Sequence, residues 1–340
     1  MIHRAACFAM GTRFELVLDD DDPSRLGPIA DHVLEEITHW HNRLSLFRRD
    51  SYLSYINANA INAAVPLEPE LFELFSICLN VHRQSDGAFD PAIAPLMTTL
   101  GLHEGAILPA GDQSRDHGTH IDPASGLPLG PRGMAAVELD ADRRTIRFHS
   151  PGVVLDLGAI AKGFAIDMAA SHLREFGIER ALVHGGTSSI VAIGSPPDAD
   201  GWRIAMGSDA DAPVITLCDG ALSFSSPSGR SVETPDGSHR NTHIIDPRVG
   251  APADQGVFAA AVASALTGNA VDPWPAARCE AWSTALVVLG SRPESMPETL
   301  TSAMARGSNP PRQWSIVGPH RPYVTHTIPP GPSVSQGSRC

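Results

Sequence analysis

Apolar residues in the first part of this chain recur at helical spacing. From Leu26 to Leu44 they stand three and four residues apart, which is the period of one face of an amphipathic helix. A second helix is expected from Pro69 to just before Gly87, because proline suits a first helical turn and apolar residues follow at the same period. Phe14 to Leu18 alternates instead, which predicts a strand.

The second half of the chain mixes short strands with two further helices. Helices are expected over Gly158–Phe176 and Glu280–Leu289, each followed by a glycine that suits a helix C-terminus. The expected strands are Val137–Leu139, Thr145–Phe148, Val153–Leu155, Ala181–His184, Ile190–Ile193 and Ala259–Ala263. No regular strand–helix–strand alternation is present, so we expect an α+β fold rather than a doubly wound parallel sheet.

The chain length allows one large globular domain or two ordinary ones. The chain has 340 residues, 42% hydrophobic and 19% charged, which is ordinary for a folded domain with a sizeable core. We assign residues 1–318 to this domain and residues 319–340, rich in Pro, Gly and Ser, to a mobile tail. Leu108 to Gly133 reads as a long irregular connection. No membrane span or signal peptide is expected, which favours a cytoplasmic protein, or an exported one if a leader is missing from this sequence.

The charge balance limits the classes of partner. A formal net charge of -13 does not suit nucleic acid or an anionic membrane surface. It also repels an anionic dinucleotide at long range, so such a ligand needs a site built locally from helix termini, a few cations or a metal. Five scattered cysteines without a C-x-x-C pair make a disulfide framework or a zinc–cysteine site poor interpretations.

The segment from Asp156 to Gly163 is the most informative for chemistry. It predicts a strand, a tight turn at Gly158 and a helix start, where unpaired N–H groups attract anions. Lys162, one turn into the helix, would add a full positive charge, and Asp156 would accept hydrogen bonds from a ribose or a flavin edge. The alternative is that Asp156 caps the helix and Lys162 is solvated.

Two further segments could contact a ligand. Asp86 to Leu96 contains Gly87 and an Asp90-Pro91 turn, which predicts a rigid loop that presents backbone groups to a planar ligand or simply ends a helix. Thr242 to Gly250 contains His243, which would serve as a general base or would be an ordinary core histidine.

Glu280 and Thr284 stand four residues apart on one expected helix, so they share a helical face. A carboxylate and a hydroxyl oxygen are donors that suit Mg²⁺. The alternative is that Glu280 complements the helix dipole and Thr284 bonds back to a carbonyl of the preceding turn.

Taken in order, the motifs resemble the ApbE family, the FAD:protein FMN transferases. The matching segments are Met10-Gly11-Thr12, Gly87–Pro91, Asp156–Gly163, Gly185-Gly186, His243–Gly250 and Glu280–Ala285. The resemblance covers nearly the whole chain and implies an ApbE-type α+β fold, with mixed sheets, packed helices and a flavin cleft.

The resemblance also implies a function and a site. The implied reaction is Mg²⁺-dependent transfer of FMN from FAD to a Thr or Ser hydroxyl of an acceptor flavoprotein, with release of AMP. The carbonyl of Ala159 and the side chains of Glu280 and Thr284 would hold Mg²⁺, and the implied catalytic residues are His243 and Glu280. The residues implied to line the FAD site are Met10, Ala88, Phe89, Asp90, Asp156 and Lys162.

The sequence departs from the family pattern at several positions, which marks a divergent member. Glu280 stands where the family has Asp, Thr187 replaces an Asp after the Gly-Gly pair, and Phe224 to Ser228 lacks the family's glycine and aromatic residue. Leu266 to Arg278 looks like an insertion. Two alternatives therefore stay open: an FAD pyrophosphatase that makes FMN and AMP without an acceptor, and an FAD-binding protein without catalysis.

Overall fold

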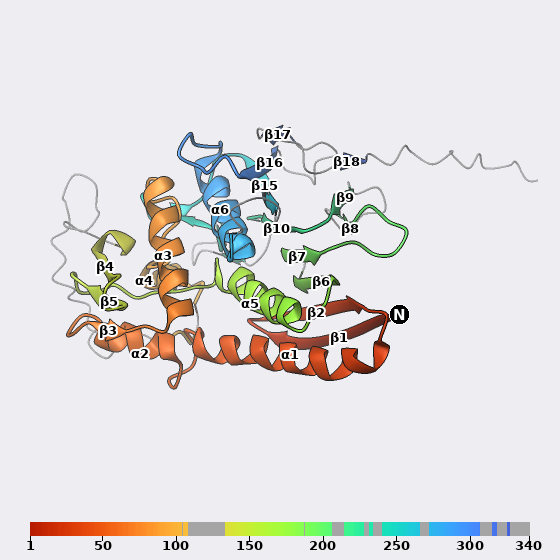
Figure 1. Ribbon diagram of the computed structural model, residues 1–340. Helices are drawn as coiled ribbons and strands as arrows, with labels where there is room; N and C mark the ends of the chain where they lie inside the picture. The colour runs from red at the N-terminus through yellow and green to blue at the C-terminus, as the bar shows by residue number, and fades with distance from the viewer. Residues whose placement is uncertain are drawn as a thin grey trace, which may run out of the picture.

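A large antiparallel sheet forms the centre of the computed structural model (Figure 1). The residues that the structure describes are 1–103, 105–107, 133–186, 188–205, 214–227, 231–233, 240–265, 272–306, 315–317 and 325–326. The eight strands run in the order β1-β2-β6-β7-β10-β15-β16-β17, and every neighbouring pair is antiparallel. Their bounds are β1 Ile2–Ala9, β2 Thr12–Asp19, β6 Arg180–Gly185, β7 Ser189–Ile193, β10 Gly220–Ser225, β15 Val257–Ala265, β16 Leu300–Arg306 and β17 Ser315–Val317.

Helices cover one face of this sheet. The helix α1 (Leu26–Arg43) packs on β1, α5 (Ala161–Glu175) packs on β6 and β7, and α6 (Pro275–Leu289) packs on β10 and β15. α5 and α6 lie side by side, and α3 (Pro69–Gln84) packs against α6 (Figure 1). The shorter helical elements are η1 Pro23–Arg25, α2 Tyr52–Asn59, α4 Ala94–Thr99 and η2 Gly133–Ala136.

A second, smaller core lies on the other face. Alternate residues of β7 point to the two cores, with Val191 in the larger one and Ile190 in the smaller one. The smaller core is closed by a three-stranded sheet of β8 (Trp202–Ala205), β9 (Val214–Leu217) and β18 (Thr325–His326). The remaining strands form small sheets of two or three strands and are β3 Val65–Pro66, β4 Val137–Asp140, β5 Thr145–Phe148, β11 Ser231–Glu233, β12 Arg240–Thr242, β13 Ile245–Asp246 and β14 Ala251–Pro252.

The α5–α6 contact is unusually close because it crosses at a glycine. A Cβ built on Gly163 would lie 2.4 Å from the carbonyl oxygen of Ala276, so only glycine fits there. One turn further along α5, the buried carboxylate of Asp167 accepts the N–H groups of Ala276 at 3.0 Å and Ala277 at 2.9 Å. These N–H groups lie in the first turn of α6, where backbone N–H groups have no acceptor within their own helix. α5 thereby fixes where α6 begins.

The expected α+β class is confirmed, and most expected elements are present. Val153–Leu155 is not a strand: the backbone N–H and carbonyl of Leu155 bond to the Asn57 side chain at 2.8 and 3.0 Å instead of to a neighbouring strand. α5 begins at Ala161 rather than at Gly158. α6 begins at Pro275, earlier than expected, so part of the expected insertion is the first turn of this helix.

Some expectations fall outside the described residues. They concern the connection over residues 108–132, Thr187, Ser228 and most of the tail over residues 319–340. Within the described residues, no helix combines the length and the apolar character needed to cross a lipid bilayer. The expected cytoplasmic location stays a prediction.

Candidate functional site

The loop that contains Asp90 is held tightly from within. Asp86 and Gly87 both take positive φ angles, 51° and 73°, and turn the chain after α3. Asp90 then accepts the N–H groups of Ala92 at 2.8 Å and Met134 at 3.1 Å. Burial raises the pKa of Asp90, although the nearby His82 and these backbone donors oppose the rise. Hydrogen bonds to the Asp90 carboxylate therefore hold this loop in its conformation.

His82, in the last turn of α3, contacts this loop, and sequence reasoning missed it. Its Nδ1 lies 3.0 Å from the carbonyl oxygen of Phe89 and 3.6 Å from Oδ2 of Asp90. The Phe89 N–H donates to Ser85 Oγ at 3.1 Å. The side chains of Ala88 and Phe89 are buried in the core. Both backbone groups of Phe89 thus have partners within the protein.

Asp156 joins this loop to the start of α5. Its N–H donates to the carbonyl of Pro91 at 2.6 Å, and its Oδ1 accepts the N–H of Gly158 at 2.8 Å. Oδ2 lies 3.3 Å from Nε2 of His103, whose side chain is 8% exposed and whose Nδ1 has no hydrogen-bond partner among the described residues. No motif contains His103, so the sequence offered no signal for it.

Lys162 and Glu280 form an ion pair between α5 and α6. The Nζ atom of Lys162 contacts Oε1 of Glu280, and the N–H of Gly163 donates to Oε2 at 2.5 Å. The Glu280 side chain is 4% exposed and that of Lys162 is 19% exposed. Glu280 therefore caps the N-terminus of α5, so the Gly163 N–H in the expected anion site already has a carboxylate partner.

Thr284 lies one turn beyond Glu280 in a cluster of hydroxyl groups. Its Oγ1 is 3.2 Å from the Glu280 carbonyl and 3.2 Å from Ser225 Oγ on β10. Ser225 also contacts Ser283 Oγ at 2.7 Å. Ala159 lies in the turn that precedes α5. Within the described residues, no three His, Cys, Asp or Glu side chains gather as a metal site. The donors expected for Mg²⁺ include only one such side chain, the Glu280 carboxylate, together with the Ala159 carbonyl and the Thr284 hydroxyl.

Met10 takes a positive φ angle of 49° in the two-residue turn between β1 and β2. Its N–H donates to Nδ1 of His41 on α1 at 3.1 Å. Burial, together with the nearby Arg48, lowers the pKa of His41, which suits a neutral imidazole that accepts this hydrogen bond. His41 is thus a second histidine that positions a residue predicted to line the FAD site.

His243 is half-buried and lies between β12 and β13. The segment that follows is held by Arg248, whose guanidinium donates to Asp246 at 2.9 and 2.7 Å. A Cβ on Gly87 would lie 3.7 Å from Cγ of Arg248. The His243–Gly250 segment therefore lies beside the Gly87–Pro91 loop, as a shared site requires.

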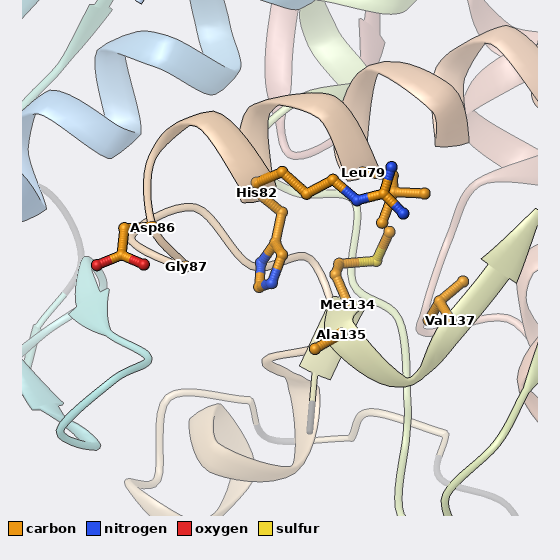
Figure 2. A pocket seen from close by; sticks show the side chains of 8 residues that line it. Leu79, His82, Asp86, Gly87, Met134, Ala135 and Val137 are labelled. Carbon is orange, nitrogen blue, oxygen red and sulfur yellow. The ribbon is translucent and has the colours of Figure 1, made fainter. Parts of the chain in front are cut away.

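A surface pocket of about 350 Å³ borders the Asp86–Gly87 turn at the start of the Asp90 loop. Figure 2 shows the His82 ring between the Gly87 turn and the Met134–Ala135 segment. The pocket lining includes none of the residues that we predict to contact FAD. It adjoins the candidate site without containing it, so the site is located by its side chains rather than by this pocket.

Comparisons with known proteins find relatives that cover most of the chain. The FAD:protein FMN transferase of Chlamydia trachomatis is 26% identical over 268 residues, which cover 79% of this chain and 76% of that protein. The protein of the same name from Escherichia coli K12 is 23% identical over 298 residues, or 86% of this chain and 79% of the relative.

Solved structures share the fold. The crystal structure of the ApbE protein of Thermotoga maritima has a TM-score of 0.71 and 25% identity, and the match covers 89% of this chain and 94% of that one. The flavin transferase ApbE of Vibrio cholerae has a TM-score of 0.68 at 21% identity, with 93% and 97% covered. The model of the ApbE family matches residues 10–305. The chain therefore belongs to the ApbE family.

Proposed function

We propose that this protein transfers FMN from FAD to a Thr or Ser hydroxyl of an acceptor protein, in a reaction that requires Mg²⁺ and releases AMP. Family membership and the relatives named FAD:protein FMN transferase support flavin transfer to a protein. The observation that carries the proposal for this chain is the buried Glu280 carboxylate, paired with Lys162 next to Thr284. The Glu280 carboxylate and the Lys162 ammonium meet there, and phosphoryl transfer needs such charged groups to bind a metal ion and phosphate oxygens.

The proposed reaction replaces one phosphoester bond by another. The acceptor hydroxyl oxygen attacks the phosphorus of the FMN half of FAD, and the bond from that phosphorus to the bridging oxygen breaks. AMP leaves with the bridging oxygen, and the hydroxyl proton goes to a base. We assign that base to His243, because a neutral imidazole accepts a proton near pH 7. His243 is half-buried, and Arg248 of the same segment lies beside Gly87 of the Asp90 loop, which supports this role.

The residues present suit Mg²⁺. The carbonyl of Ala159, the carboxylate of Glu280 and the hydroxyl of Thr284 are all oxygen donors, which this hard cation prefers. The buried Glu280 carboxylate is already balanced by one cation, the Lys162 ammonium, so this position accepts positive charge. A bound Mg²⁺ would stabilise negative charge on the phosphate oxygens.

Other side chains would bind and orient FAD. Lys162, partly exposed at the start of α5, would neutralise charge on the pyrophosphate. Asp156 is 16% exposed and is fixed by Gly158 and His103, so it would present a pre-oriented acceptor to the ribose or the flavin edge. Asp90 would act mainly by holding the loop in shape, because backbone donors occupy its oxygens.

The test is to incubate the purified protein with FAD and Mg²⁺, with and without candidate acceptor proteins. AMP is measured by chromatography and attached FMN by mass spectrometry. We expect AMP release that depends on both the acceptor and Mg²⁺, an FMN mass on one Thr or Ser, and loss of both in His243→Asn. AMP without an acceptor would instead assign a pyrophosphatase. Tight FAD binding without either product would overturn the catalytic roles of His243 and Glu280.

A further inference from the structure

Lys162 is the single lysine in the 340-residue chain, and every other basic side chain in the Lys+Arg total is an arginine. The general composition therefore does not account for a lysine at this position. An ammonium is a compact point charge on a flexible stem, whereas a guanidinium is a planar fork. A site that needs a small cation able to change partners would require lysine here.

The position of Lys162 sets up a competition. Its Nζ contacts Oε1 of Glu280, and the other carboxylate oxygen accepts the Gly163 N–H. Mg²⁺ on this carboxylate would face a second cation at contact distance, which is strongly unfavourable in a buried place. Glu280 is almost fully buried on α6 and cannot follow either cation outward. Lys162 is partly exposed, so it is the partner that can move.

We propose that Lys162 and Mg²⁺ exchange on Glu280. In the metal-free protein the Lys162 ammonium neutralises this carboxylate. When Mg²⁺ binds, Lys162 leaves and its charge is taken up by the FAD pyrophosphate. The inference rests on the proposed function, because it needs both FAD and the metal. It follows that Mg²⁺ binds weakly without FAD, and that each ligand tightens the other by the same factor.

The first test measures Mg²⁺ binding to the full chain by calorimetry in the absence of FAD. Lys162→Met removes the competing cation, so we expect it to bind Mg²⁺ at least about tenfold more tightly than the wild type. Glu280→Asp keeps a carboxylate but shortens its reach toward α5, and it should also bind more tightly. Arg180→Met is the matched control, because it removes one positive charge that pairs with Asp19 instead. Unchanged or weaker binding in both site variants, or equal tightening in the control, would overturn the exchange.

The second test uses the wild type, so it does not depend on how a variant folds. Protein grown with ¹⁵Nζ-labelled lysine gives one side-chain ammonium signal, which reports on Lys162 alone. We expect this signal to shift when Mg²⁺ and FAD are both saturating. A signal that stays at its metal-free position would show that Lys162 remains on Glu280. Mg²⁺-dependent AMP release with that result would leave the proposed function standing and reject only the exchange.

Discussion

Asp167 and Glu280 each cap the helix to which the other belongs. Asp167 on α5 accepts N–H groups from the first turn of α6, and Glu280 on α6 accepts the Gly163 N–H from the first turn of α5. Each carboxylate thus meets the partial positive charge of a helix N-terminus. The reciprocal contacts fix the register of the two helices, and this register places Lys162 on Glu280.

The close crossing makes a stability prediction. Gly163→Ala would put a methyl group into the Ala276 carbonyl, so the helices must separate. We expect a loss of about 3 kcal/mol in the free energy of unfolding, measured by urea denaturation. Gly27→Ala on α1 is the matched control, because a Cβ there meets no atom within 4 Å. Its stability should be unchanged or higher, and an equal loss in both variants would contradict the crossing.

Asp167 predicts a pH dependence. Burial, which outweighs the two backbone hydrogen bonds, raises its pKa well above the usual value. The folded protein therefore binds this proton more tightly than the unfolded chain does. Its contribution to stability is complete below about pH 3.9, the pKa of an unperturbed Asp, and is lost as pH rises through the folded-state pKa.

Unfolding curves at a series of pH values measure this contribution. Asp167→Asn cannot titrate, so the stability difference between wild type and variant should shift in favour of the variant as pH rises. Parallel stability profiles for the two proteins would show that Asp167 titrates alike in both states. Any pH dependence of stability that remains in this pH range would then come from another buried carboxyl, such as Asp90. Burial also raises the pKa of Asp90.

His103 is predicted to act on FAD binding by positioning Asp156. His103→Leu removes the 3.3 Å contact between Nε2 and Asp156 Oδ2 and should weaken FAD binding about tenfold, because Asp156 loses a group that orients its carboxylate. His103→Gln keeps an N–H donor at a similar reach and should restore most of the affinity. His149→Leu, which loses an exposed contact to Glu138, is the control. Titration of flavin fluorescence would measure all three, and equal affinities in the Leu and Gln variants would argue against positioning.

Thr284 is predicted to affect the metal rather than the fold. Thr284→Val keeps the shape but removes Oγ1, so the Mg²⁺ concentration that gives half-maximal AMP release should rise about tenfold. Ser283→Ala removes the neighbouring buried hydroxyl, which we do not assign to the metal. It should lower the free energy of unfolding by about 1 kcal/mol and leave the Mg²⁺ dependence unchanged. The opposite pattern would move the ligand role to Ser283.

The elements that were predicted correctly from the sequence are those that depend on local residue patterns. α3 begins at Pro69 as expected, because proline and the apolar period act within one helix. α6 was placed too late, since its first turn is capped by Asp167 from a distant part of the chain. His103 was missed for the same reason: folding alone brings it to Asp156. The motif residues were found through family resemblance, whereas the side chains that orient them carry no motif.

The pairing of β2 with β6 has a consequence for synthesis. Phe14 lies opposite Gly185 in this sheet. The N-terminal hairpin therefore cannot pair with β6 until that strand has been translated, much later. At about 5–20 residues per second, a ribosome needs on the order of ten seconds to deliver it. During that interval, the β2 edge and its apolar face are open to other chains. Expression yield should therefore respond to translation speed and chaperone supply, even where the finished protein is stable.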